Sequence, residues 1–294
     1  ACTRAKDARV GYAREPVSVG INRREVSRRN TTEISPERGT VGDWVDVLSV
    51  DLAGDPLAVL FVHAAHGVTL GGQNTSITAD WMGYAQRYVE ELSHGTVTAL
   101  YGQGCSGNIN SDPRGNFEIA HAQGRAMAGA VIKAAELAIP SSDITIRAAR
   151  QTFELPCFDS PPVAEAKELL KQLRADQQQT LCEGAYAREY VCQGLVQWGE
   201  WLVEQAEAGA TELTLDYEVQ ALRIGDTVVV GLPGEVFIEY ALDIEARSPF
   251  ANTIVMGYTN GNPGYIPTAA AYDDGGYEVE VAHRFYEGGR TMIT

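Results

Sequence analysis

Cysteine is scarce in this chain of 294 residues, and its few copies form no recognisable pattern. The five cysteines are an odd number without a CxxC pair, which argues against a cysteine-based structural zinc site and against a dense disulfide framework. Cys182 and Cys192 fall within a predicted helical region, at a spacing that does not place two side chains together on one helix. We therefore expect reduced, mostly buried thiols.

Basic residues and long apolar runs are also in short supply. Lys and Arg total 23 against 39 Asp and Glu, for a net charge of −16, whereas nucleic-acid binding needs clustered basic side chains. The one basic cluster, Arg23-Arg24 to Arg28-Arg29, is short and is predicted to be a solvated loop. No apolar run approaches the ~18–20 residues of a membrane span, so we expect a soluble chain without a nucleic-acid partner.

The opening segment, ACTRAKDARVGYAREP, has no initiating methionine and no continuous apolar region after its charges. It therefore does not resemble a signal peptide, and its pattern is typical of the end of a helix. We expect an upstream segment to precede it, which leaves a cytoplasmic or a secreted location equally open.

A hydrophobic content of 45% is enough for a sizeable core, and apolar runs alternate with amphipathic stretches. Strands are predicted at 17–21, 46–52, 57–64, 96–101, 213–224, 227–231 and 253–257. Helices are predicted at 79–92, 117–137 and from Glu235 to about 246. The segment 160–208 is charged and rich in Gln, and it predicts a helical hairpin inserted into the domain. The pattern predicts one α/β domain over 1–294, with mixed sheets flanked by helices.

Three apolar stretches end in glycine-rich bends that carry a possible metal ligand. They are His66 in FVHAAHGVTL, Glu235 in VVVGLPGEVF and Tyr265 in GYTNGNPGYIPT. If these side chains meet, they predict a metal-dependent hydrolase. Taken singly, His66 could be a structural histidine and Glu235 a helix-dipole partner. His63 is a weaker candidate, because residues three apart on a strand point to opposite faces.

The loop GQGCSGNIN resembles a nucleophile elbow, although it lacks the sequence GxSxG. Cys105 and Ser106 are its possible nucleophiles, but neither has an identifiable histidine partner. A tight turn is the simpler interpretation, and a hydrolase that depends on Cys105 remains an alternative.

Taken together, these motifs resemble the neutral ceramidase family of zinc-dependent amidases. The matching segments follow one another in order: GINRREV, HGVTLGGQNTSITADWMGYA, ALYGQGCSGNIN, VVVGLPGEVFIEYALDIEARSPF and GYTNGNPGYIPTAAAYDDGGYE. The resemblance implies the fold of that family's catalytic domain in its short bacterial form. It also implies hydrolysis of an N-acyl linkage, in ceramide or in another acyl-amide.

In that family, one zinc ion is held by two histidines, a glutamate and a tyrosine. The matches assign His66, Glu235 and Tyr265 to three of these positions. The other histidine belongs to a family segment that precedes everything in this chain, so the expected upstream segment would supply it.

The resemblance also identifies Arg23 with the family's active-site arginine and Tyr277 with a tyrosine that stabilises the oxyanion. Tyr286 is a second match to that tyrosine, but the spacing favours Tyr277. Asn110 stands where the family has an active-site serine, and asparagine cannot act as a nucleophile. The expected chemistry therefore depends on zinc-activated water, with Asn110 or a nearby amide positioning the carbonyl. The same departure leaves open a binding protein that has lost the activity.

Overall fold

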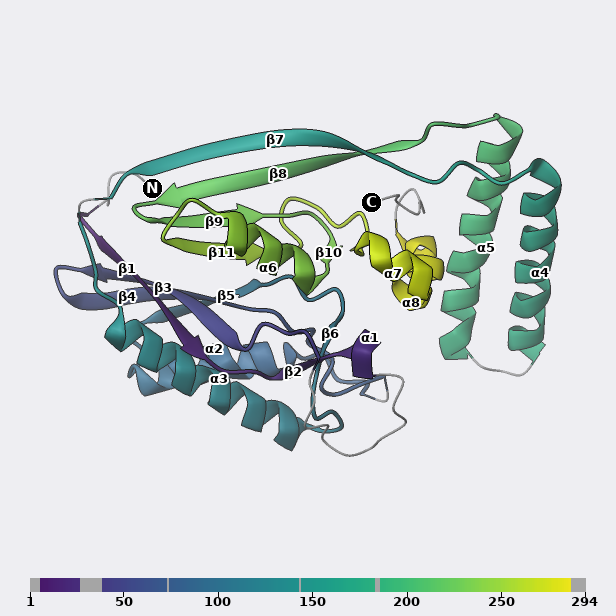
Figure 1. Cartoon of the computed structure of the whole chain (residues 1–294). Coiled ribbons are helices and arrows are strands. Elements are labelled where there is room, and N and C mark those ends of the chain that lie inside the picture. The colour runs from purple at the N-terminus through teal and green to yellow at the C-terminus, as the bar shows by residue number, and fades with distance from the viewer. Residues whose placement is uncertain (1–5, 27–38, 73, 143, 183–185, 287–294) are drawn as a thin grey trace. The chain divides into compact units, whose positions relative to one another are not determined.

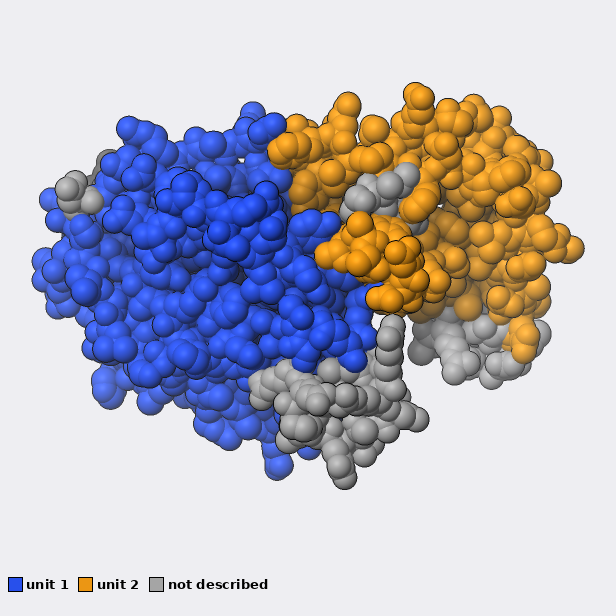
Figure 2. All heavy atoms as spheres, viewed as in Figure 1, with its two compact units in different colours: residues 1–151, 219–260 blue, residues 152–218, 261–294 orange. Residues whose placement is uncertain are grey.

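A computed structural model describes residues 6–26, 39–72, 74–142, 144–182 and 186–286. Cys2, Arg28 and Arg29 therefore lie outside the described residues. The chain forms two compact units, which are coloured separately in Figure 2. Unit 1 comprises residues 1–151 and 219–260, and unit 2 comprises residues 152–218 and 261–294.

The first sheet of unit 1 has the strand order β1-β3-β4-β5 (Figure 1). Its strands are β1 (Arg9–Pro16), β3 (Trp44–Leu52), β4 (Asp55–His63) and β5 (Thr98–Gln103). The pairs β1–β3 and β3–β4 are antiparallel, and β4–β5 is parallel. The strands predicted at 46–52 and 57–64 are thus present as β3 and β4, which pair as a hairpin.

Two helices of unit 1, α2 (Asp80–Leu92) and α3 (Phe117–Leu137), pack on each other and against this sheet. The side chain of Asn116 accepts a hydrogen bond from the backbone amide of Ile119, which fixes the start of α3. Small residues such as Ala120 and Ala128 are buried on α3, where they allow close packing. Both helices agree with the sequence prediction.

The N-terminal segment corrects one prediction, because β1 is a strand and not the end of a helix. It pairs with β3 over its whole length, from Arg9 opposite Asp51 to Pro16 opposite Trp44. Backbone pairing along a full strand outweighs the weak helical pattern of such a short charged segment.

A second sheet has the order β11-β9-β8-β7. Its strands are β7 (Ile146–Pro156), β8 (Thr214–Ile224), β9 (Thr227–Gly231) and β11 (Asn252–Met256). The predicted turn at Gly225 joins β8 and β9, and its φ of 62° favours glycine. The core of unit 1 includes a cluster of Leu48 and Val62 from the first sheet with Val229 and Ile254 from the second. Strand β7 was not predicted from the sequence, because it is almost entirely exposed and lacks an apolar pattern.

Short elements of unit 1 carry the candidate residues Arg23, Asn110 and Glu235. These elements are β2 (Gly20–Asn22), α1 (Arg23–Val26), β6 (Ile109–Ser111), β10 (Glu235–Val236) and α6 (Ile238–Arg247). The prediction that Glu235 begins a helix is wrong. Glu235 lies in β10, and α6 begins at Ile238. Phe237 is still extended, with a ψ of 150°, so the helix cannot begin earlier.

Unit 2 contains α4 (Val163–Cys182) and α5 (Tyr186–Glu207), which are the two helices predicted within 160–208. They pack through Ala166, Leu202 and Ala206, and α4 begins directly after Pro161-Pro162. The C-terminal part of the unit has short elements: β12 (Tyr265–Ile266), α7 (Ala269–Asp274), α8 (Tyr277–Glu280) and η2 (Ala282–Phe285).

The architecture is therefore α/β, with mixed sheets flanked by helices, as the sequence predicts. Across the described ranges, no helix is both long enough and apolar enough to cross a membrane. Cys105 and Cys157 are buried, and Cys192 is half-buried.

Candidate functional site

His66 and Glu235 lie next to each other in unit 1. Their Nε2 and Oε2 atoms are 3.5 Å apart, and both side chains are about nine-tenths buried. A third residue joins them: the hydroxyl of Tyr258 donates to Glu235 Oε2 at 2.9 Å and lies 3.4 Å from His66 Nδ1. An imidazole, a carboxylate and a phenol thus converge from three separate parts of the sequence.

The backbone of His66 is held by its neighbours. Its amide donates to the carbonyl of Ile109 at 2.9 Å, and its carbonyl accepts from the indole of the fully buried Trp81 at 3.2 Å. His66 also forms an isolated parallel bridge with Asn110. These contacts fix the bend that follows β4 and so fix the direction in which the imidazole leaves it.

The loop GQGCSGNIN holds the segment that carries Glu235. The amide of Gly107 donates to the carbonyl of Val236 at 2.8 Å. The side-chain oxygen of Asn108 accepts from the amide of Ile238 at 3.0 Å, and its nitrogen donates to both carboxylate oxygens of Glu239. A Cβ atom at Gly107 would lie 2.3 Å from the carbonyl oxygen of Glu235, so only glycine fits there. The loop is therefore a structural support for Glu235.

Arg23 is positioned by the pairing of β2 with β6, which places Ile21 opposite Asn110. Its guanidinium donates to Asn110 Oδ1 at 3.1 Å and to the carbonyl of Gly107 at 2.8 Å. Two predicted active-site residues thus contact each other, and Asn110 also adjoins His66. Oδ1 of Asn110 is the acceptor in this hydrogen bond, and the Nδ2 group of the same side chain can donate hydrogen bonds.

Tyr258 was not identified from the sequence. It follows β11 with a positive φ of 53°, and its amide donates to the carbonyl of Gly234 at 2.9 Å. This backbone contact ties the residue to the bend that precedes Glu235. The available signal was the tyrosine in GYTN, which follows the buried strand β11 by two residues, whereas His66 follows β4 by three.

The arrangement fits a zinc ion in the chemistry and spacing of its donor atoms. Two ligands about 2.0–2.2 Å from a tetrahedral zinc lie roughly 3.3 Å apart, close to the distance between His66 Nε2 and Glu235 Oε2. Among the described residues, no group of three His, Cys, Asp or Glu side chains could hold a metal. Within the described residues, a further ligand beside His66 and Glu235 would therefore be of another kind, such as a phenol oxygen.

Tyr265 and Tyr277 lie together in unit 2. Their ring centroids are 5.9 Å apart in an edge-on arrangement, and Tyr286 adds a third ring 6.3 Å from Tyr265. Tyr265 is buried, whereas Tyr277 is 49% exposed. The role expected for Tyr277 stays a prediction.

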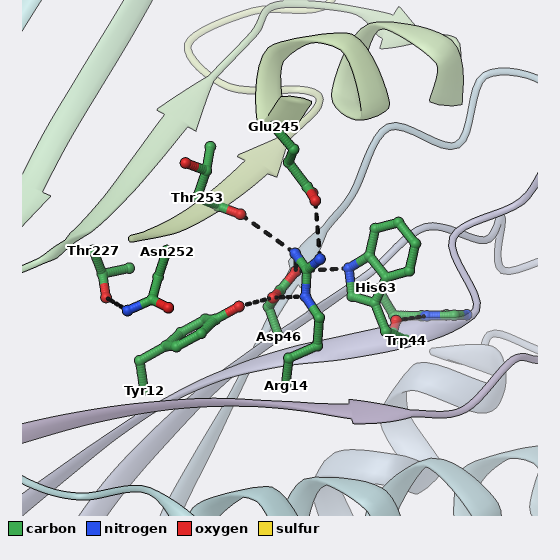
Figure 3. A network of polar contacts seen from close by, with 9 residues as sticks. All are labelled: Tyr12, Arg14, Trp44, Asp46, His63, Thr227, Glu245, Asn252 and Thr253. Atoms are coloured by element: carbon green, nitrogen blue, oxygen red, sulfur yellow. Dashed lines mark hydrogen bonds and ion pairs between the residues drawn. The ribbon is translucent and has the colours of Figure 1, made fainter. Parts of the chain in front are cut away.

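His63 belongs to a different structure, the buried polar network of Figure 3. Its Nδ1 donates to the carbonyl of Trp44 at 2.7 Å. In the same network, Asp46 accepts from Tyr12, from Arg14 and from the indole of Trp44. Arg14 also donates to Glu245 and to the carbonyl of Thr253, so the network ties the two sheets of unit 1 together.

Cys105 and Ser106 are both buried, at 1% and 0% exposure. Burial raises the pKa of the Cys105 thiol well above its usual range, with a smaller contribution from the charge of Glu245. The hydroxyl of Ser106 accepts a hydrogen bond from the side-chain amide of Gln103. Neither residue is presented as an accessible nucleophile.

No protein-family model and no curated protein matches this chain. Solved structures do match it. A neutral ceramidase from Pseudomonas aeruginosa is similar over 95% of this chain and 49% of its own, with a TM-score of 0.65 at 17% identity. A ceramidase solved in complex with C2 is similar over the whole chain and 52% of its own, with a TM-score of 0.63 at 16% identity. The chain spans about half the length of these proteins, and its fold is a ceramidase-like fold.

Proposed function

We propose that this chain is a zinc-dependent amidohydrolase that cleaves an N-acyl linkage, in a ceramide-like or another acyl-amide substrate. The observation that carries the proposal is the contact of His66 with Glu235 and Tyr258 in a largely buried setting. The ceramidase-like fold adds support, because the sequence motifs resemble the same family. On this proposal, 1–294 is the catalytic domain and 160–208 is a helical insertion within it.

His66 and Glu235 would hold the zinc ion. Tyr265 is the third ligand expected from the family resemblance, with a fourth from an upstream histidine. A bound zinc ion would lower the pKa of a coordinated water to about 7 and polarise a carbonyl. Glu235 would also keep the hydroxyl of Tyr258 in place through their hydrogen bond.

The residues around this pair would orient the substrate. Arg23 holds Asn110 through Oδ1, so the Nδ2 group of Asn110 is available in a fixed direction for the carbonyl of the acyl group. Tyr277 would donate its hydroxyl to the developing oxyanion, a type of contact that is typically worth ~10²–10³ in rate. The net charge of −16 disfavours a strongly anionic substrate.

Two alternatives predict different behaviour. A hydrolase with Cys105 as nucleophile would need an accessible thiolate, whereas this thiol is buried and its pKa is raised. A binding protein would take up an acylated ligand without turnover even when loaded with zinc. Asn110 in place of a serine is the feature that favours this second alternative.

Metal analysis of the full-length protein, coupled to a screen of N-acyl substrates of varied chain length, tests the proposal. Glu235→Gln and His66→Ala should each lose bound zinc and amidase activity together. Glu136→Gln, at an exposed position of α3, should change neither. Stoichiometric zinc in both site variants would refute the assignment, and zinc without turnover of any substrate would favour the binding protein.

A further inference from the structure

Unit 2 contains an apolar pocket of about 230 Å³ beside the helices α4 and α5. The side chains that line it are mostly aromatic or aliphatic, and few of them are polar. The apolar side chains are Phe158, Leu169, Trp198, Trp201, Leu202 and Leu213. Engineered apolar cavities of about 150 Å³ hold benzene, so this pocket has room for a substituted ring.

Two polar atoms in the lining lack hydrogen bonds. Ser160 Oγ and His283 Nδ1 are both buried, and within the described part of the chain neither has a hydrogen-bond partner. Buried polar atoms are normally satisfied, because an unsatisfied one costs free energy. Both residues line the same pocket, so one bound polar group could satisfy them.

The imidazole of His283 is held against Trp198. The two rings meet edge-on with centroids 5.6 Å apart, and the guanidinium of Arg284 lies 4.8 Å from the indole centroid. Burial, with a smaller contribution from the charge of Arg284, lowers the pKa of His283 to about 4. The imidazole is therefore neutral at physiological pH, and Nδ1 accepts or donates according to the tautomer.

We propose that this pocket binds a small, uncharged aromatic molecule that carries one hydroxyl group. Flat side chains at Phe158, Trp198 and Trp201 favour a ring over a flexible chain, because aromatic pairs gain from edge-to-face and offset contacts. The hydroxyl can both donate and accept, which matches Ser160 Oγ and His283 Nδ1.

The charges around the pocket argue for a neutral ligand. Asp159 lines the pocket, and its negative charge disfavours the binding of an anion. Its Oδ1 already accepts a hydrogen bond from the backbone amide of Glu212 at 2.7 Å. The positive charge of Arg284, which lies next to Trp198, disfavours the binding of a cation. A neutral ring with one polar group is repelled neither by Asp159 nor by Arg284.

Calorimetric titration with 4-methylphenol and with toluene tests the proposal, because the two probes differ by one hydroxyl. 4-Methylphenol should bind about 3- to 10-fold more tightly than toluene, as expected for one or two hydrogen bonds. Two of the four tryptophans line the pocket, so both probes should also change the intrinsic fluorescence. Absence of binding by both probes would overturn the proposal.

Variants test the polar groups of the pocket and its apolar space separately. Ser160→Ala combined with His283→Phe keeps the shape and the ring against Trp198, and it should abolish the preference for 4-methylphenol while toluene still binds. Leu213→Trp should fill the space and abolish both. The single variant Ser160→Ala, the mildest change, should already reduce the preference. An unchanged preference in the double variant, or tighter binding of 1-hexanol than of 4-methylphenol, would overturn the proposal.

Discussion

The Nε2 atom of His66 lies 3.5 Å from the Oε2 atom of Glu235. The two residues are far apart in the sequence, yet each follows an apolar strand at a glycine-containing bend, His66 after β4 and Glu235 after β9. The contact is shielded from solvent, so water competes little with whatever these two groups bind together. It is the geometric basis of the proposed hydrolase.

Tyr258→Phe tests whether this tyrosine positions Glu235. The change removes one hydroxyl that contacts both Glu235 and His66. If the pair holds zinc, zinc affinity should fall by about 10- to 100-fold, the usual effect of losing a group that orients a ligand. Competition with a chromogenic chelator measures this affinity.

Tyr88→Phe is the matched control for that experiment. Its hydroxyl contacts His121 between α2 and α3, so its loss should leave zinc affinity unchanged. An equal loss of affinity in both variants would show a general effect of destabilisation and would remove the role assigned to Tyr258.

Gly107→Ala tests the support that the loop provides to Glu235. The added Cβ would meet the carbonyl of Glu235 at 2.3 Å, and that backbone must move. We expect destabilisation of about 1–3 kcal/mol, typical of overpacking, together with weaker zinc binding. Urea unfolding and zinc titration measure the two effects.

Gly129→Ala is the control for glycine replacement. It lies in α3, and nothing stands within 4 Å of the added Cβ. It should stabilise the protein by about 0.4–1 kcal/mol, because alanine restricts the unfolded chain more than glycine does. Normal zinc binding by Gly107→Ala would contradict the supporting role.

Asp46→Ala should be strongly destabilising. This buried carboxylate accepts hydrogen bonds from Tyr12, Arg14 and Trp44, and its loss removes the acceptor that these three partly buried side chains share (Figure 3). Removing one partner of a buried ion pair typically costs about 3–5 kcal/mol. Thermal and urea unfolding measure the change.

Asp243→Ala removes a different ion pair, with Arg247 one helical turn away on the exposed side of α6. A pair of this kind is worth about 0.3–0.5 kcal/mol. A similar cost for the two aspartate variants would mean that the buried network does not hold the sheets of unit 1 together.

Iodoacetamide and a zinc chelator distinguish the proposed amidase from a Cys105-dependent hydrolase. Burial raises the pKa of the Cys105 thiol, so the reactive thiolate is suppressed and Cys105 should be alkylated more slowly than the half-buried Cys192. Peptide mapping after timed alkylation measures both rates. Activity should survive alkylation and disappear with the chelator, and the opposite pattern would support the cysteine alternative.

Much of the secondary structure could be predicted because it depends on local pattern. The apolar runs of β3 and β4, the turn at Gly225 and the long helix α3 are all visible in the sequence. The segments that were missed lack such a pattern: β7 is exposed, and β1 is a strand because β3 lies beside it.

The apolar strands, the bends that follow them and the residue types at those bends can be predicted from the sequence, because these features depend on neighbours along the chain. The contact of His66 with Glu235, the position of Tyr258 beside them, and the contact of Arg23 with Gly107 in the supporting loop are visible only in the folded protein. These contacts depend on how separate strands pack against one another. Distances between strands are set by the shared core and are not encoded in any one segment.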